Sequence, residues 1–159
     1  MSKYARPVFI FSLFLFFSTL SHATTLDDIL KAKTEPDGIV IEIVTGDATA
    51  LEWALPQAQH MIKQIHQRWP DLHIAIVTHG TEQFALQKSK QNKAKKIHKI
   101  TKSLVKKGVQ LHVCGTHASW KGVSEEDFPD YVDVASAAPA TINDYRALGY
   151  KVIVIDSDD

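Results

Sequence analysis

Short apolar runs rich in Val and Ile recur along the chain and predict five strands. They cover residues 39–44, 72–78, 109–114, 132–136 and 150–155. Their apolar character is nearly continuous, which is typical of strands that are covered on both faces of a parallel sheet.

Apolar positions recur every three or four residues in two of the intervening stretches, 51–69 and 92–107, which predicts amphipathic helices there. Pro56 is expected to kink or restart the first of them. Pro139 can open a last helix that ends at Leu148. Residues 26–33 form a short amphipathic stretch, 82–90 a weak helix or loop, and 115–122 a turn with a short helical piece.

Strands that alternate with helices imply right-handed crossovers. The predicted fold class is therefore α/β, a three-layer α/β/α sandwich with a five-stranded parallel sheet. Residues 24–159 fit one such domain, since domains commonly have about 100–150 residues.

The first 23 residues have the pattern of a secretory signal peptide. Lys3 and Arg6 precede an apolar run of 13 residues, 8–20, and Ser21-His22-Ala23 supplies the small residues that a signal peptidase reads. A spanning helix needs about 20 apolar residues, so a retained anchor is disfavoured. We expect cleavage after Ala23 and a periplasmic or secreted protein that has no membrane contact once it is cleaved.

Charge is balanced overall but unevenly distributed. Residues 24–159 hold 16 basic and 18 acidic side chains, a formal charge of −2, which argues against nucleic acid as a partner. Nine lysines and no acid lie between Lys88 and Lys107, and an acidic cluster follows at 125–133. The lysines are interpreted as a solvated helix face, with contact to an anionic partner as the alternative.

Cys114 is the only cysteine, so it cannot form an internal disulfide. It is a buried small side chain, half of an intermolecular bridge, or a reactive thiol. Ligands bind beyond the carboxyl ends of parallel strands, and Cys114 ends the third predicted strand. Backbone amides or an imidazolium can stabilise a thiolate there. The candidate catalytic residue is Cys114, and the candidate binding residues are His79, Gly80, Gly115, Thr116 and His117.

The same residues could in principle form other kinds of site. Cys114 and His117 with His79 or His112 would suit zinc or copper, but there is no second cysteine or close histidine pair. The glycines match no phosphate-binding spacing, and a Cys-His hydrolase would lack a recognisable chain order. We predict no cofactor and no resident metal. His112 is interpreted as a core or interface histidine, and Trp120 as covering core, a subunit contact or the pocket.

Several motifs in order resemble the DsrE/DsrF-like family. The stretch from Leu104 to Thr116 reads LVKKGVQLHVCGT, and it is followed by GVSEED at 122–127, VDVAS at 132–136 and GY at 149–150. Earlier, VTHG at 77–80 matches the end of the family's second strand. The resemblance covers nearly all of residues 24–159 and includes the family's small exported members.

The resemblance implies a five-stranded parallel sheet, homo-oligomers that are trimers or hexamers, and a cysteine in a pocket lined by subunits. Relatives pass persulfide sulfur between cysteines, so Cys114 and His79 with their adjoining glycines are the positions carried over. The chain departs from relay members because one relay cysteine, on another loop, has no counterpart here, and because export is expected.

Two classes of function follow. In the first, Cys114 handles sulfane sulfur as a persulfide carrier or sulfurtransferase-like protein, with a protein or small sulfane-sulfur compound as donor or acceptor. In the second, the protein is a non-catalytic oligomeric module that binds a small ligand or metal and has a structural cysteine. An accessible, reactive thiol favours the first, and a buried, inert thiol the second.

Overall fold

A computed structural model describes residues 24–156 of the protein. The predicted signal peptide, 1–23, lies outside the described residues.

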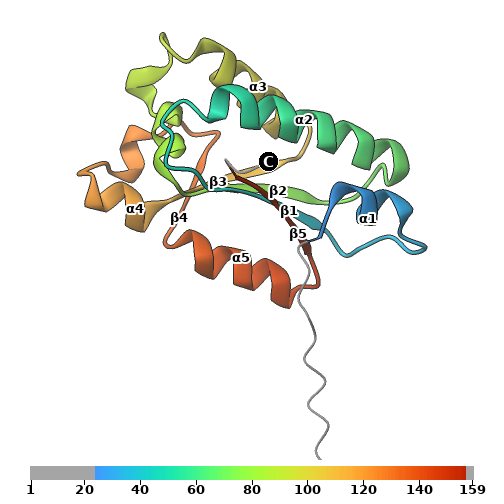
Figure 1. The fold of residues 1–159 in the computed structure, drawn as a ribbon. Coiled ribbons are helices and arrows are strands. Elements are labelled where there is room, and N and C mark those ends of the chain that lie inside the picture. The colour runs from blue at the N-terminus through green and yellow to red at the C-terminus, as the bar shows by residue number, and fades with distance from the viewer. Residues whose placement is uncertain (1–23, 157–159) are drawn as a thin grey trace, which may run out of the picture.

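The sheet has five parallel strands, as the sequence predicted (Figure 1). They are β1 (Ile39–Ile43), β2 (Ile74–Thr78), β3 (Gln110–Cys114), β4 (Asp133–Ala135) and β5 (Lys151–Ile155). Their order across the sheet is β4-β3-β2-β1-β5. The first strand therefore lies inside the sheet, between β2 and the last strand.

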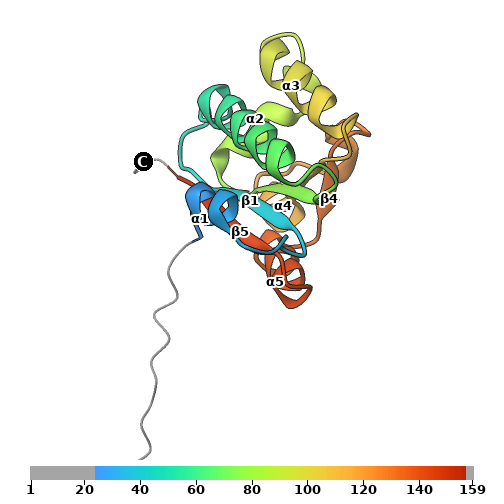
Figure 2. The same ribbon diagram turned by 90° about the vertical axis from the view of Figure 1, so that its right-hand side faces the viewer.

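Helices cover both faces of the sheet and make the predicted three layers. The helices are α1 (Leu26–Lys31), α2 (Leu51–Arg68), α3 (Lys95–Val105), α4 (Gly115–Trp120) and α5 (Ala138–Ala147). Both views show α2 and α3 on one face and α5 on the other (Figures 1 and 2). Three short 3-10 turns complete the chain: η1 (Thr81–Leu86), η2 (Lys88–Lys90) and η3 (Glu125–Asp127).

The two faces bury cores of different size, because successive side chains of a strand point to opposite sides. Ile39, Ile41 and Ile43 of β1 belong to a large cluster with α2 and α3, whereas Val40 faces α5. The smaller cluster consists of Val40, Ala75, Val77, Cys114, Ala138 and Ile142. Cys114 thus lies on the thinly covered side of the sheet.

Local differences from the prediction concern helix breaks. Pro56 lies inside one continuous helix, so the predicted restart is wrong. It lies in the second turn, where only the carbonyl of the exposed Glu52 loses its helical partner. Residues 82–90, predicted as a weak helix or loop, form two 3-10 turns with Gln87 between them. No helix within residues 24–156 is long and apolar enough to cross a bilayer.

Candidate functional site

The carboxyl ends of β2 and β3 bring His79 and Cys114 together. The register pairs Thr78 with Val113, so the next residues, His79 and Cys114, lie alongside each other. The helix α4 begins directly after Cys114, and α5 begins after the neighbouring strand β4. The strand ends and these two helix starts surround one pocket.

The pocket has a volume of about 410 Å³. It is lined by His79, Cys114, Thr116, His117, Trp120, Ala137 and Pro139. Cys114 is only 5% exposed, so little of its side chain reaches the pocket, whereas Trp120 at the pocket wall is 75% exposed. Four of the six residues predicted for the site therefore share one pocket. Of the roles weighed for Trp120, lining the pocket is confirmed, and covering the core is wrong.

The sulfur of Cys114 accepts hydrogen bonds from the first turns of two helices. Its Sγ lies 3.5 Å from the backbone nitrogen of His117 in α4 and 3.5 Å from that of Ala138 in α5. The residue that precedes α5, Ala137, makes no side-chain cap, so the sulfur takes over part of that role. The first amides of a helix lack partners inside the helix and favour an acceptor with negative charge. This surrounding is suited to a thiolate.

Two histidines in the pocket are held in defined tautomers. His117 Nδ1 lies 2.9 Å from the carbonyl oxygen of His79, and His79 Nε2 lies 2.8 Å from Glu42 Oε1. A carbonyl oxygen only accepts, so Nδ1 of His117 carries the hydrogen, and Nε2 is left as the acceptor of the neutral ring. The ionised carboxylate of Glu42 also only accepts, so His79 donates from Nε2. Its Nδ1 is then the acceptor nitrogen of the neutral ring. Each ring has one nitrogen without a partner among the described residues.

The remaining predicted residues shape the backbone around the pocket. A Cβ on Gly80 would lie 2.1 Å from the carbonyl oxygen of Thr45, and one on Gly115 would lie 3.0 Å from that of Ala135. Only glycine fits the first position, and the second is tight. Thr116 donates from Oγ1 to the carbonyl of Ser136 at 2.7 Å, which ties α4 to the segment after β4.

Glu82 and Gln83 support the site, and neither was predicted from the sequence. Glu82 is fully buried, and its carboxylate accepts from Thr78 Oγ1 at 2.6 Å, from Gly80 N at 2.8 Å and from Thr45 N at 3.0 Å. Gln83 Oε1 accepts from the backbone nitrogen of Cys114 at 2.7 Å, while Gln83 Nε2 is buried without a partner among the described residues. Together they fix the turn η1 to the segment that follows β1, to β2 and to β3.

Gln83 meets the last amide of β3. β2 ends at Thr78, opposite Val113, and the side-chain oxygen of Gln83 lies at the next amide of β3, that of Cys114. This contact adds a side-chain acceptor at the end of the strand ladder. The sequence signal for Glu82 and Gln83 was their position as polar residues just after the strand end at His79-Gly80. The weak periodicity of 82–90 gave no reason to expect that they are buried.

The metal alternative is not assembled. His112 Nε2 lies 2.9 Å from Tyr145 Oη, and His112 does not line the pocket. Burial lowers the pKa of His112, opposed by the nearby carboxylate of Asp133. Within residues 24–156, no group of three or more His, Cys, Asp or Glu side chains is arranged to hold a metal ion.

Fold and site together define a class: a parallel α/β protein with one cysteine at the carboxyl end of an inner strand. A sequence profile of the DsrE/DsrF-like family matches residues 39–155, and the chain belongs to this family. The resemblance inferred from the motifs is therefore confirmed. No curated protein sequence matches the chain.

Solved structures share the fold at low sequence identity. The protein of unknown function MTH1491 from Methanobacterium thermoautotrophicum has a TM-score of 0.61 and 16% identity, covering 75% of this chain and all of its own. The ychN protein of E. coli has a TM-score of 0.55 and 14% identity, covering 74% and 99%. BT1422 from Bacteroides thetaiotaomicron, also of unknown function, has a TM-score of 0.52 and 15% identity, covering 75% and 95%. These likenesses establish the fold alone.

Proposed function

We propose that this protein carries sulfane sulfur as a persulfide on Cys114. The thiolate of Cys114 attacks the outer sulfur of a persulfide or polysulfide donor. A bond forms between Sγ and that sulfur, the donor's S–S bond breaks, and the donor leaves as a thiolate with the electron pair. An acceptor thiolate then attacks the outer sulfur and releases Cys114, so no external oxidant or reductant is consumed.

The observation that carries the proposal is the pair of backbone amides that point at Sγ. Both lie at 3.5 Å and belong to the first turns of α4 and α5. Thiolate nucleophiles are favoured by donors of this kind. Membership of the DsrE/DsrF-like family supports the same reading. The Gln83 contact adds a fixed backbone position for the nucleophile.

The two histidines fit the proton movements of such a step. Both histidines line the pocket, and His117 Nε2 and His79 Nδ1 have no partner among residues 24–156. A histidine nitrogen that comes within reach of Sγ would take the proton of the Cys114 thiol and return one to the departing thiolate. The apolar wall from Trp120, Ala137 and Pro139 would exclude water from the persulfide.

Compartment and assembly belong to the same proposal. The charged start, the short apolar run and Ser21-His22-Ala23 support export with a mature N-terminus at Thr24. A trimer or hexamer is supported by the family and by Trp120, which is 75% exposed beside the pocket and would be covered by a neighbouring subunit. N-terminal sequencing and light scattering of the native protein test these two points.

A second candidate function rests on the burial of Cys114. At 5% exposure, the thiol packs against Val40, Ala75 and Val77 in the smaller core. That environment also suits a structural cysteine below a pocket that binds a small ligand without chemistry. The two candidates differ in whether the folded protein reacts at Cys114.

Sulfur loading distinguishes the two candidates. The folded protein is treated with polysulfide and its intact mass is measured, alongside Cys114→Ser, His117→Gln and the matched control His112→Gln, which changes a histidine outside the pocket. We expect one added sulfur atom on the wild type and the control, slower loading of His117→Gln, and none on Cys114→Ser. Alkylation of the folded wild type should modify Cys114 without prior unfolding.

If the wild type gains no sulfur and its thiol is alkylated only after unfolding, sulfur carriage is contradicted. The function as a non-catalytic binding module would then be the one supported. Loading that is equal in wild type and His117→Gln would remove the proposed role of His117 while keeping that of Cys114.

A further inference from the structure

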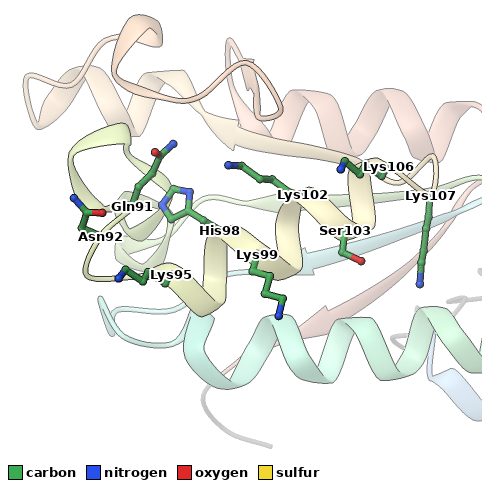
Figure 3. Close-up of a pocket in the computed structure, with 9 residues that line it drawn as sticks. All are labelled: Gln91, Asn92, Lys95, His98, Lys99, Lys102, Ser103, Lys106 and Lys107. Carbon is green, nitrogen blue, oxygen red and sulfur yellow. The ribbon is translucent and has the colours of Figure 1, made fainter.

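The outer surface of α2 and α3 carries two adjoining hollows lined by basic and neutral side chains. The larger, about 730 Å³, runs along α3 and is lined by Lys95, Lys99, Lys102, Lys106 and Lys107 among neutral residues (Figure 3). The second, about 580 Å³, lies between α2 and α3, contains Lys63 and shares Lys107 with the first. No acidic residue lines either hollow. We call the surface of these six lysines the basic face.

The positive charge of the basic face is not neutralised by neighbouring carboxylates. Within residues 24–156, no salt bridge involves any of the nine lysines between Lys88 and Lys107. Lys102 lies over the ring of Tyr131 at 5.0 Å, and Lys88 donates to the backbone carbonyl of Glu126 at 2.8 Å. The ring contact leaves the charge of Lys102 in place. Lys88, outside the basic face, also lies near the carboxylate of Glu126, whose pKa is lowered mainly by a backbone hydrogen bond and to a smaller extent by Lys88. Outside this lysine-rich segment, residues 24–159 hold seven basic and 18 acidic side chains, so most of the basic charge is concentrated in this one segment.

A helix surface can be solvated without a row of lysines such as the one on α3. Lys95, Lys99, Lys102 and Lys106 succeed one another at spacings of three and four, where like charges destabilise a helix and a glutamate would stabilise it. All four are exposed, so packing does not demand lysine. His98, also in the larger hollow, adds no charge near neutral pH, because burial lowers its pKa and both ring nitrogens bond within the fold.

We propose that the basic face binds a compact soluble ligand with several clustered phosphate groups. Lysines act as point charges and lack the fork of arginine that selects a single phosphate by geometry, so the face recognises charge density. α3 spans about 16 Å over its 11 residues, and its hollow is concave, which fits a compact polyanion better than a flat surface. The site is separate from the Cys114 pocket, with which it shares no lining residue.

Calorimetric titration with tripolyphosphate tests the proposal in the purified protein. The test variant is Lys99→Gln with Lys106→Gln, and the matched control is Lys33→Gln with Lys151→Gln, which removes two exposed lysines elsewhere. We expect about ten-fold weaker binding in the test variant, less than two-fold change in the control, and weaker binding at higher salt. The test variant relieves repulsion between like charges, so its thermal unfolding should be no lower than that of the wild type.

Sedimentation with vesicles distinguishes the sources of phosphate. Vesicles of phosphatidylglycerol are compared with phosphatidylcholine, with and without tripolyphosphate as competitor. Binding of tripolyphosphate that depends on Lys99 and Lys106 supports the proposal. Binding to anionic vesicles without binding of tripolyphosphate would assign the face to a membrane and overturn it, as would equal losses in test and control variants or no binding at all.

Discussion

The two faces of the sheet divide stability and chemistry between them. On the side of α2 and α3, the buried side chains of β1 and β3 are Ile39, Ile41, Ile43, Leu111 and Val113. On the side of α5, the same strands place Val40 and Cys114 in a small core, with His112 half-buried on the same side of β3. Because side chains alternate along a strand, a strand of five residues can contribute both to the large core and to the side of the sheet that carries the pocket. A thin cover over one face is what leaves room for a pocket at Cys114.

The largest expected effect compares equal truncations in the two cores. Ile41→Ala, in the large core, should lower the free energy of unfolding by about 3–5 kcal/mol, and Ile142→Ala, under α5, by about 2–3 kcal/mol. The difference arises because a cavity in the thick core is enclosed on all sides, whereas α5 can settle toward the sheet. Denaturant unfolding measures both. Equal losses would mean that the two faces contribute alike to stability.

A smaller loss is expected at Glu82, which ties the segment after β1 and the end of β2 to the turn η1. Glu82→Gln keeps the shape but puts an amide group where backbone and hydroxyl donors now point, so it should cost about 1–3 kcal/mol. Glu52→Gln, an exposed glutamate on α2, is the control and should change stability by less than about 0.5 kcal/mol. If both variants unfold alike in denaturant, the buried carboxylate does not hold the turn η1.

The smallest effect is a pH dependence shared by the two faces. Burial lowers the pKa of His98 on the α3 side and of His112 on the α5 side. The unfolded chain therefore binds protons more readily, and stability should fall as pH drops below about 6.5, toward the lower pKa values of the folded state. Each of His98→Gln and His112→Gln should reduce this fall between pH 7 and pH 5, measured by denaturant unfolding. A fall unchanged in both variants would assign it to other groups.

Strong patterns made the fold predictable from the sequence. The Val- and Ile-rich runs specify strands buried on both faces, and Gly108 and Gly149 end their helices with positive φ. The pocket residues Cys114, Thr116 and His117 followed from the rule that ligands gather at the carboxyl ends of strands. The role of Pro56 was less predictable, since one missing amide in an early turn can be tolerated without a break.

The supports of the site depended on three-dimensional detail. Gln83 reaches the amide of Cys114 from the turn after β2, a contact across 31 positions that neither strand's own sequence specifies. Glu82 meets donors from Thr45, which follows β1, and from Thr78, which ends β2. The sulfur's contact with Ala138 likewise joins residues 24 positions apart. Contacts of this kind are set by tertiary packing, and the periodicity of a local stretch of sequence does not predict them.

The position of β1 has a consequence for how the chain reaches its folded state. β1 pairs with β2 on one side and with β5 on the other, with Ile39 opposite Lys151. Until the last strand is available, one edge of this largely buried strand has unpaired backbone groups, which invite pairing with other chains. Closure of the sheet must therefore wait for the carboxyl-terminal segment, and this long-range pairing favours slow folding. A chain that lacks residues 151–155 should accumulate as an aggregation-prone species that has most of its helices but no complete sheet.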